Sequence, residues 1–420
     1  MGFLHVYTLV AAIVSLSASK PLGSRALAFD YDSQKVRGVN LGGWFVLEPW
    51  ITPSIFSDWA NGGGVVDEYT YTATLGKSEA SRRLEAHWSS WITEADFSEM
   101  ASFGLNHVRI PIGYWALAPL AGDPYVQGQL PYLDQAMGWA RKHGLKVMLD
   151  LHGAPGSQNG FDNSGKAGSI NWQSGDNVKN TLTAIRQLAE RYASQTDVVT
   201  AIQLLNEPAN WGNDISTTTA GDDPRLQPRH GVVIHDAFLD PSSYWNGFMN
   251  QASGVNHIIL DTHIYQIFSP GEVARKPCEH VQVACAAAPR IKDTDKWTIV
   301  GEWTGAQTDC AKWLNGLGKG ARYDGSFGGA TGSSGSCQTK SEGTVAGLLD
   351  VDKVNMEYYI EAQLDAYEQH SGWIFWAWKT ESAPEWHFRD LTRAGIIPQP
   401  LTSRKHPAQC GTAQCLIPGN

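Results

Sequence analysis

Two glutamates at the ends of apolar segments could form a catalytic pair. The segment VVTAIQLL (198–205) is followed by Asn206, Glu207 and Pro208, and the segment WTIVGEW (297–303) contains Glu302. Hydrolysis of a glycosidic bond needs two carboxyl groups flanking the bond, about 5–5.5 Å apart in retaining enzymes and about 6.5–9.5 Å apart in inverting ones. A single glutamate at a strand end is usually solvated, so this chemistry requires a fold that brings both together.

Eight short apolar segments predict strands that could bring the two glutamates together. They cover residues 35–41, 107–112, 145–151, 198–205, 231–236, 257–265, 297–303 and 372–378. Helices are predicted over 92–103, 131–143, 174–194, 242–252 and 354–369, and long loops over 52–80, 208–228 and 325–343. Continuously apolar strands that alternate with helices favour an α/β fold, a single-domain (β/α)8 TIM barrel. A doubly wound open sheet is the alternative.

Polar residues gather where the predicted strands end. They are Asn40, Arg109, Asp150, His152, Asn206, Glu207, His235, Asp236, His263, Tyr265, Glu302, Trp376 and Lys379. One polar residue at a strand end is ordinarily just surface, but in a barrel these ends form a single rim, where active sites lie. The set therefore predicts a site that contains both glutamates.

The amino-acid composition limits the classes of ligand that the chain could bind. The 420 residues are 42% hydrophobic and 18% charged, with a formal net charge of -10, so no nucleic-acid partner is expected. Seventeen tryptophans could fill a large core or stack on sugar rings. No motif for a metal, nucleotide or other cofactor stands out, and we expect none.

The N-terminus resembles a secretory signal peptide. Residues 3–16 are nearly all apolar, a run too short to span a membrane, and small residues follow. We assign 1–19 to a signal peptide, 20–34 to a pro-segment or disordered N-terminus, and 35–420 to the catalytic domain. The prediction is a secreted protein, extracellular or in the cell wall, without a membrane span.

Six cysteines occupy the last third of the chain. They are Cys278, Cys285, Cys310, Cys337, Cys410 and Cys415. An even number in a secreted chain predicts disulfides, and their spacing does not match a structural zinc site. Six cysteines allow 15 pairings, and spacing alone does not choose among them.

Longer motifs resemble a known family. LLNEPAN and VGEWTGA are similar to the two signature segments of glycoside hydrolase family 5. RGVNLGGWFVLEPWITPSIF, HVRIPIGYW, DLHGAPGSQNGFDNSG, DTHIYQIFSP and GWIFWAWKTESAPEW resemble its fungal exo-β-1,3-glucanase branch. The resemblance runs from about residue 35 to Cys410.

The resemblance implies roles for the residues in these motifs. Glu207 would be the general acid/base and Glu302 the nucleophile. We expect burial to raise the pKa of the acid, and Arg109 and Tyr265 to lower that of the nucleophile. Asn206 would bind the sugar 2-hydroxyl, and His263 would orient Glu207.

Further matched residues would form the substrate pocket. Phe161 and Phe268 would clamp a glucose at the entrance, or else merely cover the barrel top. Trp376 would stack under the reacting sugar, with Trp378, two residues along on the same predicted strand face, as the alternative. The other matched pocket residues are Glu48, His152, Asp162 and Asn163.

The family usually has two bridges, which match Cys285–Cys410 and Cys310–Cys337. Cys278 and Cys415 would then add a third bridge, with a swapped pairing, Cys278–Cys410 and Cys285–Cys415, as the alternative.

Together these features predict a monomeric, retaining enzyme that releases glucose from the non-reducing ends of β-1,3-glucan and can transglycosylate. A β-1,6-glucanase, an endo-acting glucanase and an inactive glucan-binding wall protein are the alternatives.

Overall fold

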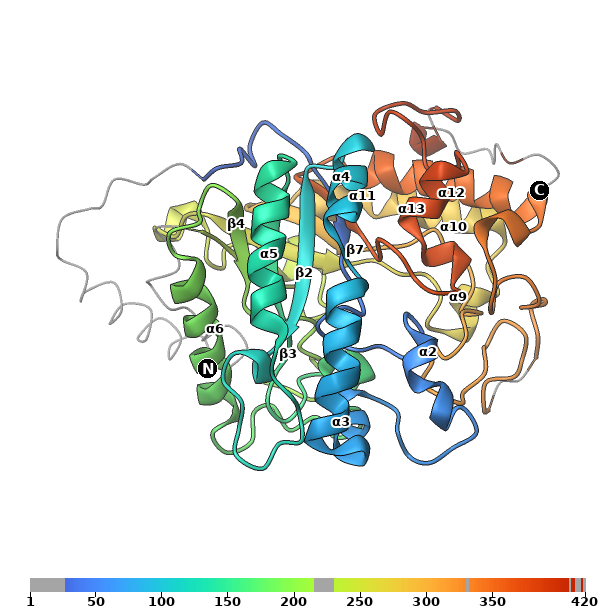
Figure 1. The fold of residues 1–420 in the computed structure, drawn as a ribbon. Helices are drawn as coiled ribbons and strands as arrows, with labels where there is room; N and C mark the ends of the chain where they lie inside the picture. The colour runs from blue at the N-terminus through green and yellow to red at the C-terminus, as the bar shows by residue number, and fades with distance from the viewer. Residues whose placement is uncertain (1–26, 215–229, 330–331, 408, 412–416, 418–420) are drawn as a thin grey trace.

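A closed barrel of eight parallel strands forms the centre of the computed structural model (Figure 1). The structure describes residues 27–214, 230–329, 332–407, 409–411 and 417. The strands are β1 (Val36–Asn40), β2 (His107–Gly113), β3 (Lys146–Gly153), β4 (Val199–Gln203), β5 (Gly231–His235), β6 (Ile258–His263), β7 (Trp297–Glu302) and β8 (Gly372–Phe375). Each strand pairs with the next, and β8 pairs with β1. All eight predicted strands and the TIM barrel are confirmed.

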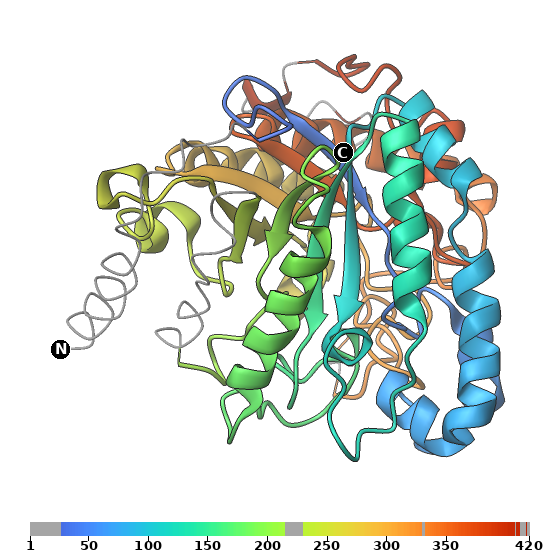
Figure 2. The same cartoon turned by 60° about the vertical axis from the view of Figure 1, so that its left-hand side comes forward.

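Helices surround the barrel. Figures 1 and 2 show α4, α5 and α6 along the outside of the strands. The helices are α2 (Pro53–Phe56), α3 (Glu68–Ser90), α4 (Glu94–Ser102), α5 (Gln129–Lys142), α6 (Asn177–Tyr192), α8 (Pro241–Trp245), α9 (Pro270–Val273), α10 (Pro277–Ala286), α11 (Ala288–Lys292), α12 (Asp350–Tyr367) and α13 (Phe388–Arg393). No described helix is long and apolar enough to cross a membrane.

Two predictions about the helices and loops were wrong. The predicted loop 52–80 contains the start of α3, which begins where the Asp67 side chain accepts a hydrogen bond from the backbone N–H of Thr70. A non-helical glycine, Gly76, at φ 71°, interrupts the helical pattern there. The predicted helix 242–252 ends at Trp245, because the backbone turns at Asn246 and Gly247 has a φ of +86°.

The amino-terminal end of the barrel is closed from below by residues that precede β1. Phe29 and Tyr31 are buried against Val36 and strand residues such as Ile299. The Tyr31 hydroxyl donates to Oγ1 of Thr200 at 3.0 Å. We propose that residues 27–34 belong to the folded domain rather than to a pro-segment; the predicted signal peptide, 1–19, lies outside the described residues.

Candidate active site

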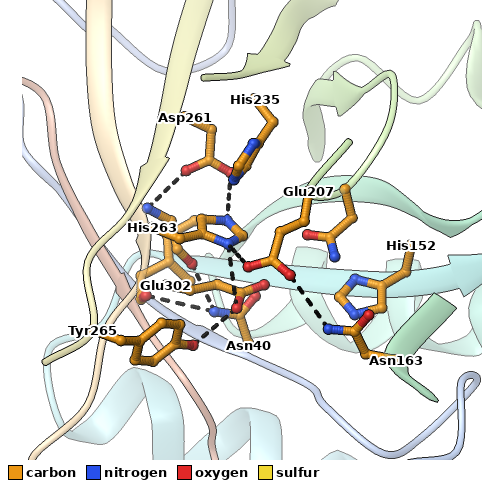
Figure 3. Close-up of polar contacts among 12 residues, drawn as sticks. Asn40, His152, Asn163, Glu207, His235, Asp261, His263, Tyr265 and Glu302 are labelled. Atoms are coloured by element: carbon orange, nitrogen blue, oxygen red, sulfur yellow. Dashed lines mark hydrogen bonds and ion pairs between the residues drawn. The ribbon is translucent and has the colours of Figure 1, made fainter. Parts of the chain in front are cut away.

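The two glutamates meet on either side of His263 at the carboxyl ends of the strands (Figure 3). Glu207 follows β4, and Glu302 and His263 end β7 and β6. Oε1 of Glu207 lies 2.7 Å from Nδ1 of His263, and Oε2 of Glu302 lies 3.4 Å from the same nitrogen. The two carboxylate oxygens are therefore no more than about 6 Å apart.

The backbone of Glu207 is held in an uncommon conformation. Its φ is +45°, in the left-handed region that non-glycine residues rarely adopt, at a cost of about 1–3 kcal/mol. The side chain is buried, and Nδ2 of Asn163 donates to its Oε2 at 3.3 Å. Strain of this kind at a buried carboxylate is typical of functional sites.

Arg109, on β2, lies at the centre of the polar network beneath the site. Its fully buried guanidinium donates to Oε1 of Glu302 at 2.9 Å and to Oδ1 of Asn206 at 2.7 Å, and forms an ion pair with Asp150 at 3.0 Å. Further donated hydrogen bonds reach Asn40 and Gln203. The fixed fork of an arginine suits this arrangement, which a lysine could not reproduce.

Tyr265 and Asn206, which were also predicted, belong to the group of residues around the two glutamates. The Tyr265 hydroxyl donates to Oε2 of Glu302 at 2.9 Å. Asn206 uses its oxygen to accept from Arg109, while its buried Nδ2 has no partner among the described residues. A buried amide donor without a partner is available to a ligand hydroxyl.

Asp261 supports His263 and was not predicted. Its Oδ2 lies 3.2 Å from Nε2 of His263 and accepts from Nε2 of Gln203, and its Oδ1 accepts from the backbone N–H of Gly301. A β-carbon at Gly301 would lie 2.1 Å from Oδ1 of Asp261, so only glycine permits this approach. Asp261 precedes His263 by two residues on one strand, and residues with this spacing share a face.

The pKa directions reverse the prediction. Burial tends to raise the pKa of Glu207, but the hydrogen bond and charge of His263 outweigh it, and this pKa is lowered. Burial raises the pKa of Glu302, although the charge of His263 opposes it. Burial disfavours the charged form of His263, but Glu302, Asp261 and Glu207 raise its pKa well above its ordinary value. The pKa values of the three groups are therefore coupled, and Glu207, His263 and Glu302 share their protons.

His152, on β3, and Trp376, which follows β8, pack against each other at the carboxyl ends of the strands. Nδ1 of His152 lies 2.6 Å from Oδ2 of Asp150, and its buried Nε2 has no partner among the described residues. The Trp376 ring stacks on the His152 ring at 5.5 Å. Trp378 instead donates to Asp96 on α4, so the expectation that it shares the face of Trp376 was wrong.

Glu48 lies near Glu207 and Glu302 and is coupled to Asp162, and neither Glu48 nor Asp162 forms an ion pair with a cation among the described residues. Glu48 is buried and accepts from Nε1 of Trp50 at 2.9 Å. Burial and the charge of Asp162 raise the pKa of Glu48 well above its ordinary value. Burial raises the pKa of Asp162 to about 7.

Phe161 and Phe268 are both 43% exposed. The Phe268 ring packs against Tyr265 at 5.5 Å, and the Phe161 ring lies 6.3 Å from Trp211, a residue that sequence reasoning did not single out. The clamp that these two phenylalanines would form stays a prediction.

Two disulfides match the pairing that the resemblance implied, Cys285–Cys410 and Cys310–Cys337. The swapped pairing was therefore wrong. Cys278 is also disulfide-bonded, and Cys415 lies outside the described residues.

Among the described residues, one triad has the spacing of a metal site. Ligand atoms of Glu207, His235 and His263 lie within 4.8 Å of one another. Both ring nitrogens of His263 already contact carboxylates, however, and Nδ1 of His235 accepts from the backbone N–H of Ala237. The contacts fit a proton-holding site better than a metal site.

The chain is similar to known proteins over nearly its full length. It is 71% identical over 415 residues to a glucan 1,3-beta-glucosidase from Blumeria graminis, covering 97% of both chains. It is 52% identical to a probable glucan 1,3-beta-glucosidase A from Aspergillus niger, covering 91% of this chain and 92% of the relative. Residues 67–227 match the model of the Cellulase family (glycosyl hydrolase family 5).

Among solved structures, a rutinosidase from Aspergillus niger aligns with a TM-score of 0.67 at 20% identity. The alignment covers 88% of this chain and 99% of the rutinosidase. At this identity the likeness shows the shared fold only.

Proposed function

The chain belongs to glycosyl hydrolase family 5, and we propose that it is a retaining glucan 1,3-β-glucosidase that releases glucose from the non-reducing ends of β-1,3-glucan. The observation that carries the mechanistic part is the contact of both carboxylates with Nδ1 of His263. A separation of no more than about 6 Å lies below the range of about 6.5–9.5 Å used by inverting enzymes.

The first step forms a covalent intermediate. An oxygen of Glu302 attacks the anomeric carbon while Glu207 gives its proton to the glycosidic oxygen, and the carbon–oxygen bond to the leaving sugar breaks. Arg109 and Tyr265 orient the Glu302 carboxylate. Nδ2 of Asn206 is free to donate to the sugar 2-hydroxyl, a contact that strengthens in the transition state.

Before this step, Glu207 must acquire a proton. His263 holds one 2.7 Å from Oε1 of Glu207, and its transfer would leave a neutral imidazole beside a protonated acid. Bound sugar would displace water around Glu207, and desolvation favours its neutral form. We assign the proton to this group of three residues rather than to one side chain, as is appropriate for strongly coupled sites.

In the second step, Glu207 removes a proton from water, and the water oxygen attacks the anomeric carbon. The ester bond to Glu302 breaks, and glucose leaves with its configuration retained. A sugar hydroxyl in place of water would give transglycosylation.

Other properties extend this proposal. Glu48, Asp162 and His152 would bind hydroxyls of the terminal sugar, and a site that ends at these residues would favour cleavage from chain ends. The disulfides support secretion, to the cell wall or medium. The chain would act as a monomer. A β-1,6-glucanase, an endo-acting glucanase and an inactive glucan-binding protein remain as alternatives.

Glucose release from laminarin tests the proposal. We expect the parent enzyme to release glucose as its first product, and to act more slowly on pustulan, a β-1,6-glucan. The Glu302→Gln variant should lose at least about a thousandfold in kcat, whereas Glu85→Gln, at an exposed position on α3, should be unaffected. Normal glucose release by Glu302→Gln would refute the assignment, and oligosaccharides as first products would favour endo action.

A further inference from the structure

Three exposed aromatic side chains form a row beside the catalytic glutamates. Phe161, Trp211 and Phe238 are 43%, 59% and 38% exposed. The ring centres of Phe161 and Trp211 lie 6.3 Å apart, and those of Trp211 and Phe238 lie 5.2 Å apart. Contiguous exposed apolar surface of this kind marks a binding site.

Both ends of the row are connected to Glu207 through neighbouring residues. The Phe238 ring lies 5.2 Å from that of His235, which is 4.4 Å from the ring of His263. At the other end of the row, Phe161 lies two residues before Asn163, and Nδ2 of Asn163 donates to Oε2 of Glu207. Since Glu207 would protonate the leaving oxygen, the row lies on the side through which the leaving sugar chain would extend.

Hydrogen bonds hold the loops that carry these rings. Nδ2 of Asn210 donates to the carbonyl oxygen of Ala237 at 2.6 Å, joining the loop of Trp211 to that of Phe238. Nδ2 of Asn213 donates to the carbonyl oxygen of Gln158 at 2.8 Å, joining it to the loop of Phe161. Phe238 itself has a φ of +60°, a strained conformation that these contacts maintain.

We propose that Trp211, together with Phe238, is a stacking platform for glucosyl units of the leaving chain beyond the first one. This inference rests on the proposed function and on the predicted clamp, in which Phe161 and Phe268 would hold the first such unit. Flat aromatic rings suit the apolar faces of pyranose rings.

The platform predicts a dependence on chain length. Substrates with a single unit on the leaving side, such as laminaribiose, end before Trp211. Laminaritriose and longer oligosaccharides would reach it and gain affinity from stacking on the Trp211 ring.

The test compares kcat/KM for laminaribiose, laminaritriose and laminarihexaose in the parent and Trp211→Ala. We expect Trp211→Ala to lose about 3- to 10-fold on the two longer substrates, mainly through KM, and to stay within about twofold on laminaribiose. Trp211→Phe should recover most of the loss. Tyr244→Ala, at a 51% exposed residue on α8 outside the row, is the matched control and should change none of the three values.

An unchanged ratio between long and short substrates in Trp211→Ala would overturn the platform while leaving the proposed function intact. An equal loss on all three substrates would also overturn it, because it would indicate a general structural effect. A parent enzyme that releases no glucose from any of these oligosaccharides would instead contradict the proposed function, and the platform with it.

Discussion

His263 determines how Glu207 and Glu302, the two carboxylates proposed to be catalytic, share a proton. The residue contacts Glu207, Glu302 and Asp261, and its pKa is raised by all three. Because the nucleophile must be ionised and the shared proton must be present, activity should fall at both ends of the pH range. The acidic limb of the pH profile should lie above pH 4.5, because burial raises the pKa of Glu302. The basic limb should lie above pH 6.5, because the pKa of His263 is raised.

Tyr265→Phe tests the support of the nucleophile. The change removes one hydrogen bond to an ionised carboxylate, about 1.5–3 kcal/mol, and keeps the ring that packs on Phe268. We expect kcat on laminaritriose to fall about 10- to 100-fold, and the acidic limb of the pH profile to move to higher pH.

The matched control is Tyr31→Phe at the opposite end of the barrel. It removes a hydrogen bond to Thr200, so it should lower thermal stability without changing kcat. If Tyr265→Phe retained full kcat, the hydroxyl would have no part in orienting Glu302.

Several residues of the site could be predicted, and others could not, for identifiable reasons. Glu207, Glu302, Arg109 and Tyr265 stand in motifs at strand ends, where the barrel places them together. The pKa directions could not be predicted, because they depend on the distances from His263 to three carboxylates. Trp211 gave no signal, since one tryptophan among seventeen is informative only when its exposure is known.

Among the elements, α3 connects the barrel to the loop that carries Phe161 and Asn163. Asp67 at its start accepts hydrogen bonds from Thr70 and also from the backbone N–H of Ala167, at 2.7 Å. The backbone N–H of Tyr69 donates to the carbonyl oxygen of Gly165. The beginning of this helix therefore positions one side of the pocket.

Asp67→Ala should lower the free energy of unfolding by about 2–4 kcal/mol, because it removes the helix cap and leaves the N–H of Ala167 without its partner. KM should rise as the loop loosens. Urea denaturation and laminaritriose kinetics measure both effects. Asp67→Asn keeps an acceptor oxygen and should lose less than half as much; equal losses would show that the cap is not responsible.

The strands were easier to predict than α3. Eight apolar segments rich in β-branched residues indicate strands independently of the conformation of the loops between them. Their number favours a closed barrel. The start of α3 contains Thr70, Thr72 and Gly76, which weaken the helical pattern, so its existence depends on the Asp67 cap and on packing against the rest of the fold.

At the scale of the whole molecule, several buried acids have pKa values that are higher in the folded state, so their ionisation lowers the free energy of unfolding. Burial raises the pKa of Glu68 to about 8 and those of Asp162, Asp236 and Glu385 to about 7. The folded state then binds more protons than the unfolded state, so these acids make stability fall as pH rises from about 4.5 to 8. His107, His87 and His280 act in the opposite direction, but only below about pH 6.5, because burial lowers the pKa of His107 to about 3 and those of His87 and His280 to about 4.

We therefore expect the free energy of unfolding to decrease between pH 6.5 and 8, and the decrease to be smaller by about 1–2 kcal/mol in Glu68→Gln. Glutamine keeps an acceptor for the backbone N–H of Leu47 and has no charge to bury. Urea denaturation across this pH range measures the difference. Glu85→Gln, exposed on the same helix, should behave as the parent does; an identical pH dependence in Glu68→Gln would contradict the assignment.

The central claim is that Glu207 and Glu302 act together across one sugar by double displacement. Time-resolved proton NMR of laminarin hydrolysis tests it most directly, because the anomer of glucose that appears first reveals the stereochemical outcome. The account predicts β-glucose as the first product, followed by slow mutarotation to the mixture. If α-glucose appeared first, the reaction would invert configuration, and the covalent role of Glu302 would be wrong.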